Sequence, residues 1–283
     1  MNRSIFSELY YKVFQSGNPL FLFIGINVLV FLAINLLAAG EFLTGGSDSA
    51  ADWLQLQLSM PAYYENLPYK FWTLITYMFT QRGFFHLLFN MLWLYWLGLI
   101  FLDFLNKRQF IFTYLAGGLA GAILYLLAFN LLPVFSGTVE NSILLGSSAS
   151  VMAVVVATAT LVPNFTIQML FLGAVKLKYL ALAYFILDVI GIGSAPGGSI
   201  AHIGGALLGF IYIQQLNRGN DFSNVFKRRS KLKIVKTKST VSSTSTSLPN
   251  QETIDKILDK ISHSGYDSLT KTEKEQLFNA SKK

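Results

Sequence analysis

Six stretches of the chain contain almost no charged residues, and each is long enough to cross a lipid bilayer. A helix needs roughly 20 apolar residues to span a hydrocarbon core about 30 Å thick. Because lipid offers no hydrogen bonds to the backbone, a spanning segment of this kind must be helical. The stretches are residues 19–38, 84–104, 109–132, 147–163, 178–193 and 200–217. We therefore predict an all-α fold, a polytopic membrane helix bundle with six transmembrane helices.

The composition favours the same class of protein. Hydrophobic residues make up 53% of the chain and charged residues only 13%, whereas charged residues approach a quarter of an ordinary soluble domain. The chain has no cysteine, which excludes disulfides and thiolate chemistry. Ala38 and Ala39 follow the first apolar stretch as in a signal peptide, but that stretch is too long for one, so we expect an uncleaved helix.

One further apolar region leaves the topology open. Residues 165–175 carry no charge, but Pro163 and Asn164 precede them and Lys176 and Lys178 follow. We interpret this region as interfacial. Its insertion into the membrane would change both the number of spans and the topology.

Basic residues predict which ends of the helices face the cytoplasm, because Lys and Arg are retained there. With six spans, one side receives Arg3, Lys12, Lys107, Arg108, Lys176, Lys178 and the basic run after Asn217. We therefore predict that both termini of this integral membrane protein are cytoplasmic. A compact chain in which we recognise no targeting peptide favours a bacterial cytoplasmic membrane. The net charge of +7 is concentrated in the tail, and we interpret it as a topology signal that attracts anionic lipid, without nucleic-acid binding.

The connection between the first two spans, residues 39–83, is rich in Trp, Tyr and Phe with scattered polar residues. Amphipathic aromatic segments prefer the headgroup region, so we expect it to lie partly in the outer interface. A small extramembrane subdomain is the alternative.

The tail after the last span predicts a small helical hairpin. Apolar residues recur there at helical spacing, at Ile254, Ile257, Leu258 and Ile261. Gly265 is placed to end this helix, and Thr270 with Glu273 matches a capping box for a second one. His263 is expected to be solvated, and the sequence names no partner for the hairpin.

These patterns divide the chain into four segments. They are a cytoplasmic N-terminal segment (1–18), a six-helix membrane domain (19–217), a basic and Ser/Thr-rich linker (218–250) and a cytoplasmic helical hairpin (251–283).

Polar residues occur where three of the predicted helices begin. His86 and Asn90 open the second span, Gly146 and Ser148 the fourth, and His202 the sixth. These three spans run in the same direction, so their first residues lie at similar depth. A polar side chain at that depth is unfavourable unless it has partners or a water-filled cavity, and we expect these residues to meet.

The residue types at this level suit acyl transfer. A serine becomes a useful nucleophile when a histidine takes its proton, and the reaction needs donors where an oxyanion develops. His86 and Asn90 share one helical face and could act with backbone N–H groups at the start of the fourth span. Asp188 is a competing carboxylate, for which we expect capping or loop bonding. Each residue alone is more often structural, so the prediction depends on their coincidence.

The three ordered motifs resemble those of the rhomboid family of intramembrane serine proteases. HLLFN (His86–Asn90) is similar to the family's H-x-x-x-N, GSSA (Gly146–Ala149) to G-x-S-[GA], and AHIGGALLG (Ala201–Gly209) to A-H-x-x-G-x-x-x-G. The resemblance covers about residues 19–217.

The resemblance implies a Ser148 nucleophile and a His202 general base acting as a dyad. It implies an oxyanion hole of His86, Asn90 and the Ser148 backbone N–H, with no cofactor and no metal. Structural support near the site would come from Gly146, Gly205, Gly209 and Met152. The substrates would be single-pass or polytopic membrane proteins, cut in or near a transmembrane segment.

Two positions depart from the family pattern. Trp72 is followed by Thr73 where the family often has Trp-Arg, and Met152 stands where an aromatic usually packs against the histidine. A thioether can pack on an imidazole, so we expect an altered rate and not inactivity. The alternative function is a non-catalytic protein of the same fold that binds membrane-protein helices. A transporter is disfavoured because the sequence shows no inverted halves with matching broken helices.

Overall fold

The computed structural model describes residues 4–46, 49–169, 173–226 and 251–281. The chain divides into two compact units, Met1–Arg229 and Ser230–Lys283. The division falls inside the predicted linker, of which residues 227–250 lie outside the described residues. Each unit is described by itself.

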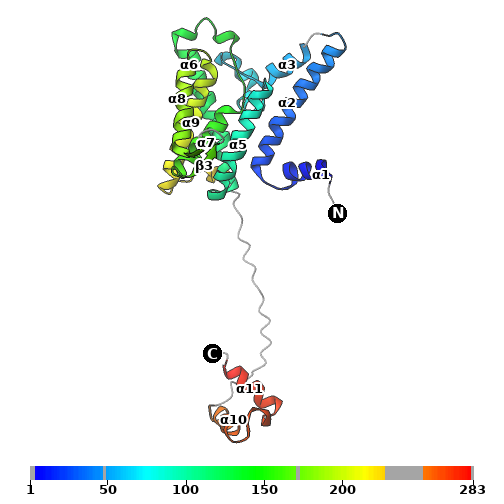
Figure 1. Ribbon diagram of the computed structural model, residues 1–283, viewed down its shortest axis with the longest axis vertical. Helices are drawn as coiled ribbons and strands as arrows, with labels where there is room; N and C mark the ends of the chain where they lie inside the picture. The colour runs from blue at the N-terminus through cyan, green and yellow to red at the C-terminus, as the bar shows by residue number, and fades with distance from the viewer. Residues whose placement is uncertain (1–3, 47–48, 170–172, 227–250, 282–283) are drawn as a thin grey trace. The chain divides into compact units, whose positions relative to one another are not determined.

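The first unit is a helix bundle whose main helices occupy the six predicted spans (Figure 1). They are α2 (Pro19–Leu43), α5 (Phe84–Phe104), α6 (Lys107–Leu131), α7 (Ser148–Leu161), α8 (Leu177–Gly191) and α9 (Pro196–Asn217). Among the described residues, α2, α5, α6 and α9 have the length and hydropathy to cross a membrane. With 14 and 15 residues, α7 and α8 are only about 21 to 23 Å long at 1.5 Å per residue. Both helices are thus shorter than the predicted spans at residues 147–163 and 178–193, and six membrane crossings stay a prediction.

Helix α7 is short because it lies inside the bundle. It packs against α5, α6, α8 and α9, and eleven of its fourteen residues are buried. A short apolar helix of this kind is typical of a core element, not of one that spans the bilayer by itself.

Small residues allow α9 to approach α7 closely. A Cβ at Gly205 would collide with the carbonyl oxygen of Ala149, and one at Gly209 with that of Ala153. Contacts of this type between small residues are how helices associate closely in lipid. His202 lies one turn before Gly205, so this contact brings it toward the start of α7.

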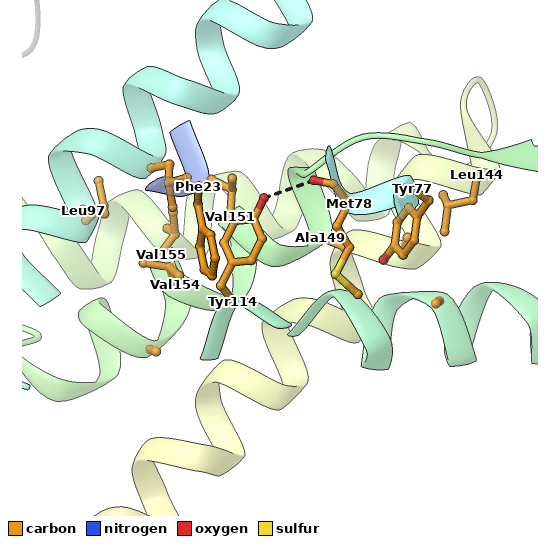
Figure 2. Packing of buried hydrophobic residues seen from close by; sticks show 14 of the residues in the cluster. Phe23, Tyr77, Met78, Leu97, Tyr114, Leu144, Ala149, Val151, Val154 and Val155 are labelled. Atoms are coloured by element: carbon orange, nitrogen blue, oxygen red, sulfur yellow. Dashed lines mark hydrogen bonds between the residues drawn. The ribbon is translucent and has the colours of Figure 1, made fainter. Parts of the chain in front are cut away.

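The connection before α5 folds into a series of short elements. They are α3 (Ser49–Leu58), β1 (Met60–Pro61), η2 (Tyr64–Asn66), η3 (Pro68–Lys70), α4 (Thr73–Thr76) and η4 (Tyr77–Phe79). Strand β1 pairs antiparallel with β2 (Ile143–Leu144), just before α7. Tyr77 and Met78 enter the buried core, and the Tyr114 hydroxyl donates to the Met78 carbonyl at 3.1 Å (Figure 2). The connection is thus anchored to the bundle beside the start of α7.

The described part of residues 165–175 forms strands and not a further membrane helix. Its residues contribute to β3 (Thr166–Met169) and β4 (Gly173–Lys176), which pair antiparallel. Each strand has only four residues, far fewer than the roughly 20 of a spanning helix. The described part of this region therefore adds no span.

The remaining short elements lie at the ends of the bundle helices. They are α1 (Ile5–Tyr10), η1 (Tyr11–Gln15), η5 (Pro133–Phe135), η6 (Val139–Asn141) and η7 (Phe222–Phe226).

The first residues of the predicted linker belong to the bundle instead. Asp221 accepts from Arg108 of α6 at 2.8 Å and from the Tyr212 hydroxyl of α9 at 3.0 Å. Burial acts to raise the pKa of Asp221, but hydrogen bonds from Ser223, Tyr212 and Arg108 outweigh it and lower that pKa. The first unit therefore extends through η7, beyond the predicted boundary at residue 217.

The second unit contains α10 (Gln251–Ser264), η8 (Tyr266–Ser268) and α11 (Lys271–Ser281), in the range of the predicted hairpin. Gly265 has a φ of 76° where α10 ends. The predicted capping box is present, with Thr270 N–H donating to Glu273 at 2.7 Å and Glu273 N–H to the Thr270 hydroxyl at 3.4 Å. The backbone hydrogen bond from Thr270 and the ion pair with Lys260 lower the pKa of Glu273 to about 2. His263 is exposed, as predicted.

Candidate active site

Four of the predicted site residues line one cavity of about 360 Å³. His86 and Asn90 come from α5, Ser148 from α7 and His202 from α9. The rest of the wall is aromatic and aliphatic and comes from α5 and α8. The four side chains that the sequence predicted at similar depth therefore lie around one cavity.

Ser148 is the first residue of α7. Backbone N–H groups in the first turn of a helix have no intrahelical acceptor, so this turn offers free donors beside the hydroxyl. Gly146 precedes it with a φ of 119°, and a Cβ at that position would lie 2.9 Å from Cε1 of His86. Glycine is needed here both for the backbone conformation and for the space occupied by the imidazole.

The three neighbouring serines differ in their burial and in their access to the cavity. Ser147 and Ser150 are fully buried, whereas Ser148 is 8% exposed and is the one of the three that lines the cavity. Ser147 Oγ accepts from Gln81 at 2.7 Å, and Ser150 Oγ has no hydrogen-bond partner among the residues that the structure describes. Only Ser148 is placed to meet a molecule in the cavity.

His202 lies on the second turn of α9, because the helix begins at Pro196, four residues before the predicted start at residue 200. Its Nδ1 is 2.7 Å from Oδ1 of Asp188 on α8. The ring of Tyr184, also on α8, packs edge-on against the imidazole with centroids 6.2 Å apart and an interplanar angle of 70°.

The Asp188 contact contradicts the sequence-based expectation of capping or loop bonding. Asp188 lies three residues before the end of α8, and His202 lies six residues after the start of α9. Both residues are therefore close to the short turn at residues 192–195, and the two helices that it joins pack against each other. This closeness to a short turn is the signal in the sequence that could have predicted the pair.

The described residues show no hydrogen bond between Ser148 Oγ and the His202 imidazole, although both side chains line the same cavity. Catalytic hydrogen bonds are often long without substrate and tighten when it binds. With Nδ1 held by Asp188, the other ring nitrogen of His202, Nε2, is the one left for a serine hydroxyl.

His86 and Asn90 lie one turn apart on α5. Asn90 is 5% exposed, and its Nδ2 donates to Oε1 of Gln81 at 3.4 Å. Gln81 Nε2 in turn donates to Asn27 of α2 at 3.0 Å and to Ser147 at 2.7 Å. This buried chain of amides fixes Asn90 relative to the start of α7. Sequence reasoning missed Gln81 and Asn27, although each is a polar residue in or beside an apolar stretch.

Met152 is fully buried. Its packing on the imidazole stays a prediction, whereas the aromatic ring beside His202 is supplied by Tyr184 from a different helix. Within the described ranges, no three His, Asp or Glu residues gather in a way that could hold a metal ion.

Family models match part of each unit. The Rhomboid domain matches residues 68–218, which is just over half of the chain and includes α5 to α9 with all three motifs. Residues 248–283 match a family of unknown function, DUF6576. A search of curated proteins gives no significant match.

Proposed function

The chain belongs to the rhomboid family, and on this premise we propose that it is an intramembrane serine endopeptidase that cleaves transmembrane segments of membrane proteins. The observation that carries the proposal is that Ser148 and His202 line the same cavity. Members of the fold that only bind helices have no need of a nucleophile beside a base. Here both are present, together with two further polar side chains.

The proposed reaction proceeds through an acyl-enzyme. Ser148 Oγ attacks the carbonyl carbon of the scissile bond while its proton passes to Nε2 of His202. The tetrahedral intermediate collapses, and the leaving amine takes the proton from His202. Water then attacks the ester in the same way, which releases the carboxylic acid and restores Ser148.

The oxyanion that develops in each step needs preorganised donors. We assign this role to the backbone N–H of Ser148 and to the side chains of His86 and Asn90. Removing one donor from an oxyanion hole typically lowers kcat by about 10²- to 10³-fold. The amide chain through Gln81 restricts the position of Asn90 and so supports this role.

The wall of the cavity indicates the class of substrate. Leu180, Ala183 and Leu187 of α8 and Phe89 and Trp93 of α5 are apolar or aromatic. An apolar peptide segment suits such a wall, and its scissile bond would meet the polar residues at the base of the site. We therefore propose single-pass or polytopic membrane proteins as substrates.

The positions of the basic residues support a membrane orientation. Arg108 at the start of α6 pairs with Asp221 after α9, and Lys107 lies near Gly17 before α2. This basic end of the bundle is opposite the end of α5 that carries His86. We propose that the basic end faces the cytoplasm and that the cavity opens to the outer face of a bacterial cytoplasmic membrane.

The proposal is tested by cleavage of a reporter transmembrane segment in liposomes. We compare the wild type with Ser148→Ala and His202→Ala, and use Ser150→Ala as the control for loss of a nearby hydroxyl. Cleavage should fall by at least about 10³-fold in the first two variants, because neither nucleophile nor base has a substitute, and persist in Ser150→Ala.

A wild type that binds several unrelated segments but cleaves none would contradict the protease and favour the helix-binding alternative. Cleavage retained in Ser148→Ala would instead show that another residue is the nucleophile.

A further inference from the structure

We infer that Asp188 is a positioning residue for the general base, so that Ser148, His202 and Asp188 act as a three-residue unit. The inference deepens the proposed function and rests on it. It departs from the two-residue dyad that the sequence motifs imply.

The contact has the geometry of a strong hydrogen bond. The distance of 2.7 Å between Nδ1 of His202 and Oδ1 of Asp188 is in the range of charge-assisted pairs. The Asp188 side chain is only 10% exposed and that of His202 16% exposed. At this burial, solvent competes little for either group.

Asp188 has no other evident reason to be buried. Its second carboxylate oxygen, Oδ2, is buried without a hydrogen-bond partner among the described residues. A buried carboxylate with a single partner destabilises a membrane helix unless that partner compensates it. Ionisable residues retained in such places usually serve a function, and the partner here is the proposed base.

The contact sets the state of the imidazole. When Nδ1–H donates to a carboxylate, the proton lies on Nδ1 and the lone pair on Nε2 is free to accept the serine proton. The same carboxylate then stabilises the imidazolium that forms. Without it, either nitrogen could carry the proton, and only one of the two tautomers is active.

Helix α8 therefore restrains His202 in two ways. Asp188 fixes the tautomer and the direction of the ring, and Tyr184 one turn earlier packs against the ring edge. His202 belongs to α9, but the two residues that align its ring belong to α8. A purely structural link between the two helices would need neither a histidine nor a defined tautomer.

The test uses Asp188→Asn in the full chain, with reporter cleavage in liposomes. The Asn amide can donate to Nδ1 and so favours the tautomer with the proton on Nε2. We expect kcat to fall by about 10²- to 10⁴-fold with KM within about threefold of the wild type. Asp188→Glu, which restores a carboxylate, should recover part of kcat. Asp103→Asn, which removes an exposed carboxylate at the far end of α5, is the matched control and should be unchanged.

A second measurement does not depend on activity. Nitrogen NMR of ¹⁵N-histidine-labelled protein should show the proton of His202 on Nδ1 in the wild type and on Nε2 in Asp188→Asn. His202→Gln assigns the signal.

The outcomes separate the two proposals. A kcat within about twofold of the wild type in Asp188→Asn, or an unchanged tautomer, would overturn the positioning role while leaving the protease intact. A loss of thermal stability with kcat and KM changed together, and no recovery in Asp188→Glu, would also overturn it in favour of a structural link. A wild type that shows the Nδ1 tautomer but cleaves nothing would refute the proposed function alone.

Discussion

Helices α7 and α8 both line the cavity, but they are held in very different ways. Eleven of the fourteen residues of α7 are buried, against three of the fifteen of α8. Ser148, the proposed nucleophile, is the first residue of the enclosed helix, and the groups that contact His202 from the side belong to the outer one. The difference indicates that the position of Ser148 is a property of the core, whereas the alignment of His202 depends on a helix with little packing of its own.

The enclosed helix has the contacts that are most sensitive to change. Successive turns of α9 approach the α7 backbone at Gly205 and Gly209, where a Cβ would meet a carbonyl oxygen. A carbonyl oxygen of a buried helix cannot move aside as a flexible side chain can. On α8, by contrast, most side chains are exposed, so a changed side chain there displaces little protein.

Among substitutions that test the difference in packing between α7 and α8, Gly205→Ala should have the largest effect. The added Cβ would collide with the Ala149 carbonyl and separate the two helices, so we expect the free energy of unfolding to fall by about 2–3 kcal/mol. Reporter cleavage should be lost with it. Thermal unfolding in nanodiscs measures the loss of stability.

Gly198→Ala is the matched control, because it lies on the same helix and its Cβ would meet nothing within 4 Å. It should change the free energy of unfolding by less than about 1 kcal/mol. Equal stability in both variants would contradict the close contact between α7 and α9.

A smaller effect should come from Tyr184→Ala on the outer helix. Loss of the ring beside His202 removes a contact that is typically worth about 0.5–1.5 kcal/mol for aromatic pairs. We expect kcat to fall by about 2- to 10-fold, with a smaller change in thermal stability than in Gly205→Ala.

Tyr184→Phe keeps the ring and should retain the wild-type kcat. If the Phe variant is impaired as strongly as the Ala variant, the hydroxyl and not the ring contact would be responsible, and the restraint from α8 would need revision.

The positions of the helices followed from hydropathy, but their lengths did not. Apolar composition extends past the end of α7 at Leu161 and fills the β3–β4 hairpin, because both the interior of the bundle and the membrane accept apolar residues. Hydropathy cannot distinguish these two environments. The start of α9 at Pro196 was missed for a related reason, since its first turn contains glycine and serine in place of an apolar run.

The common direction of the second, fourth and sixth predicted spans was enough to predict that Ser148, His202, His86 and Asn90 lie at similar depth. The partners of these residues depend on how each helix is rotated about its axis. The contact from Asp188 to His202 and the one from Gln81 to Asn90 are of this second kind. The hydrogen bonds from Arg108 and Tyr212 to Asp221 were missed because polar residues after a span are also typical of a linker.

The proposed function depends on a Ser148 nucleophile that is activated by His202. The most direct measurement is to treat the protein in liposomes with a fluorophosphonate, digest it and identify the modified residue by mass spectrometry. We expect a single phosphonylated serine, Ser148, and no adduct in His202→Ala. An adduct on Ser147 or Ser150, or equal labelling of Ser148 in His202→Ala, would contradict it.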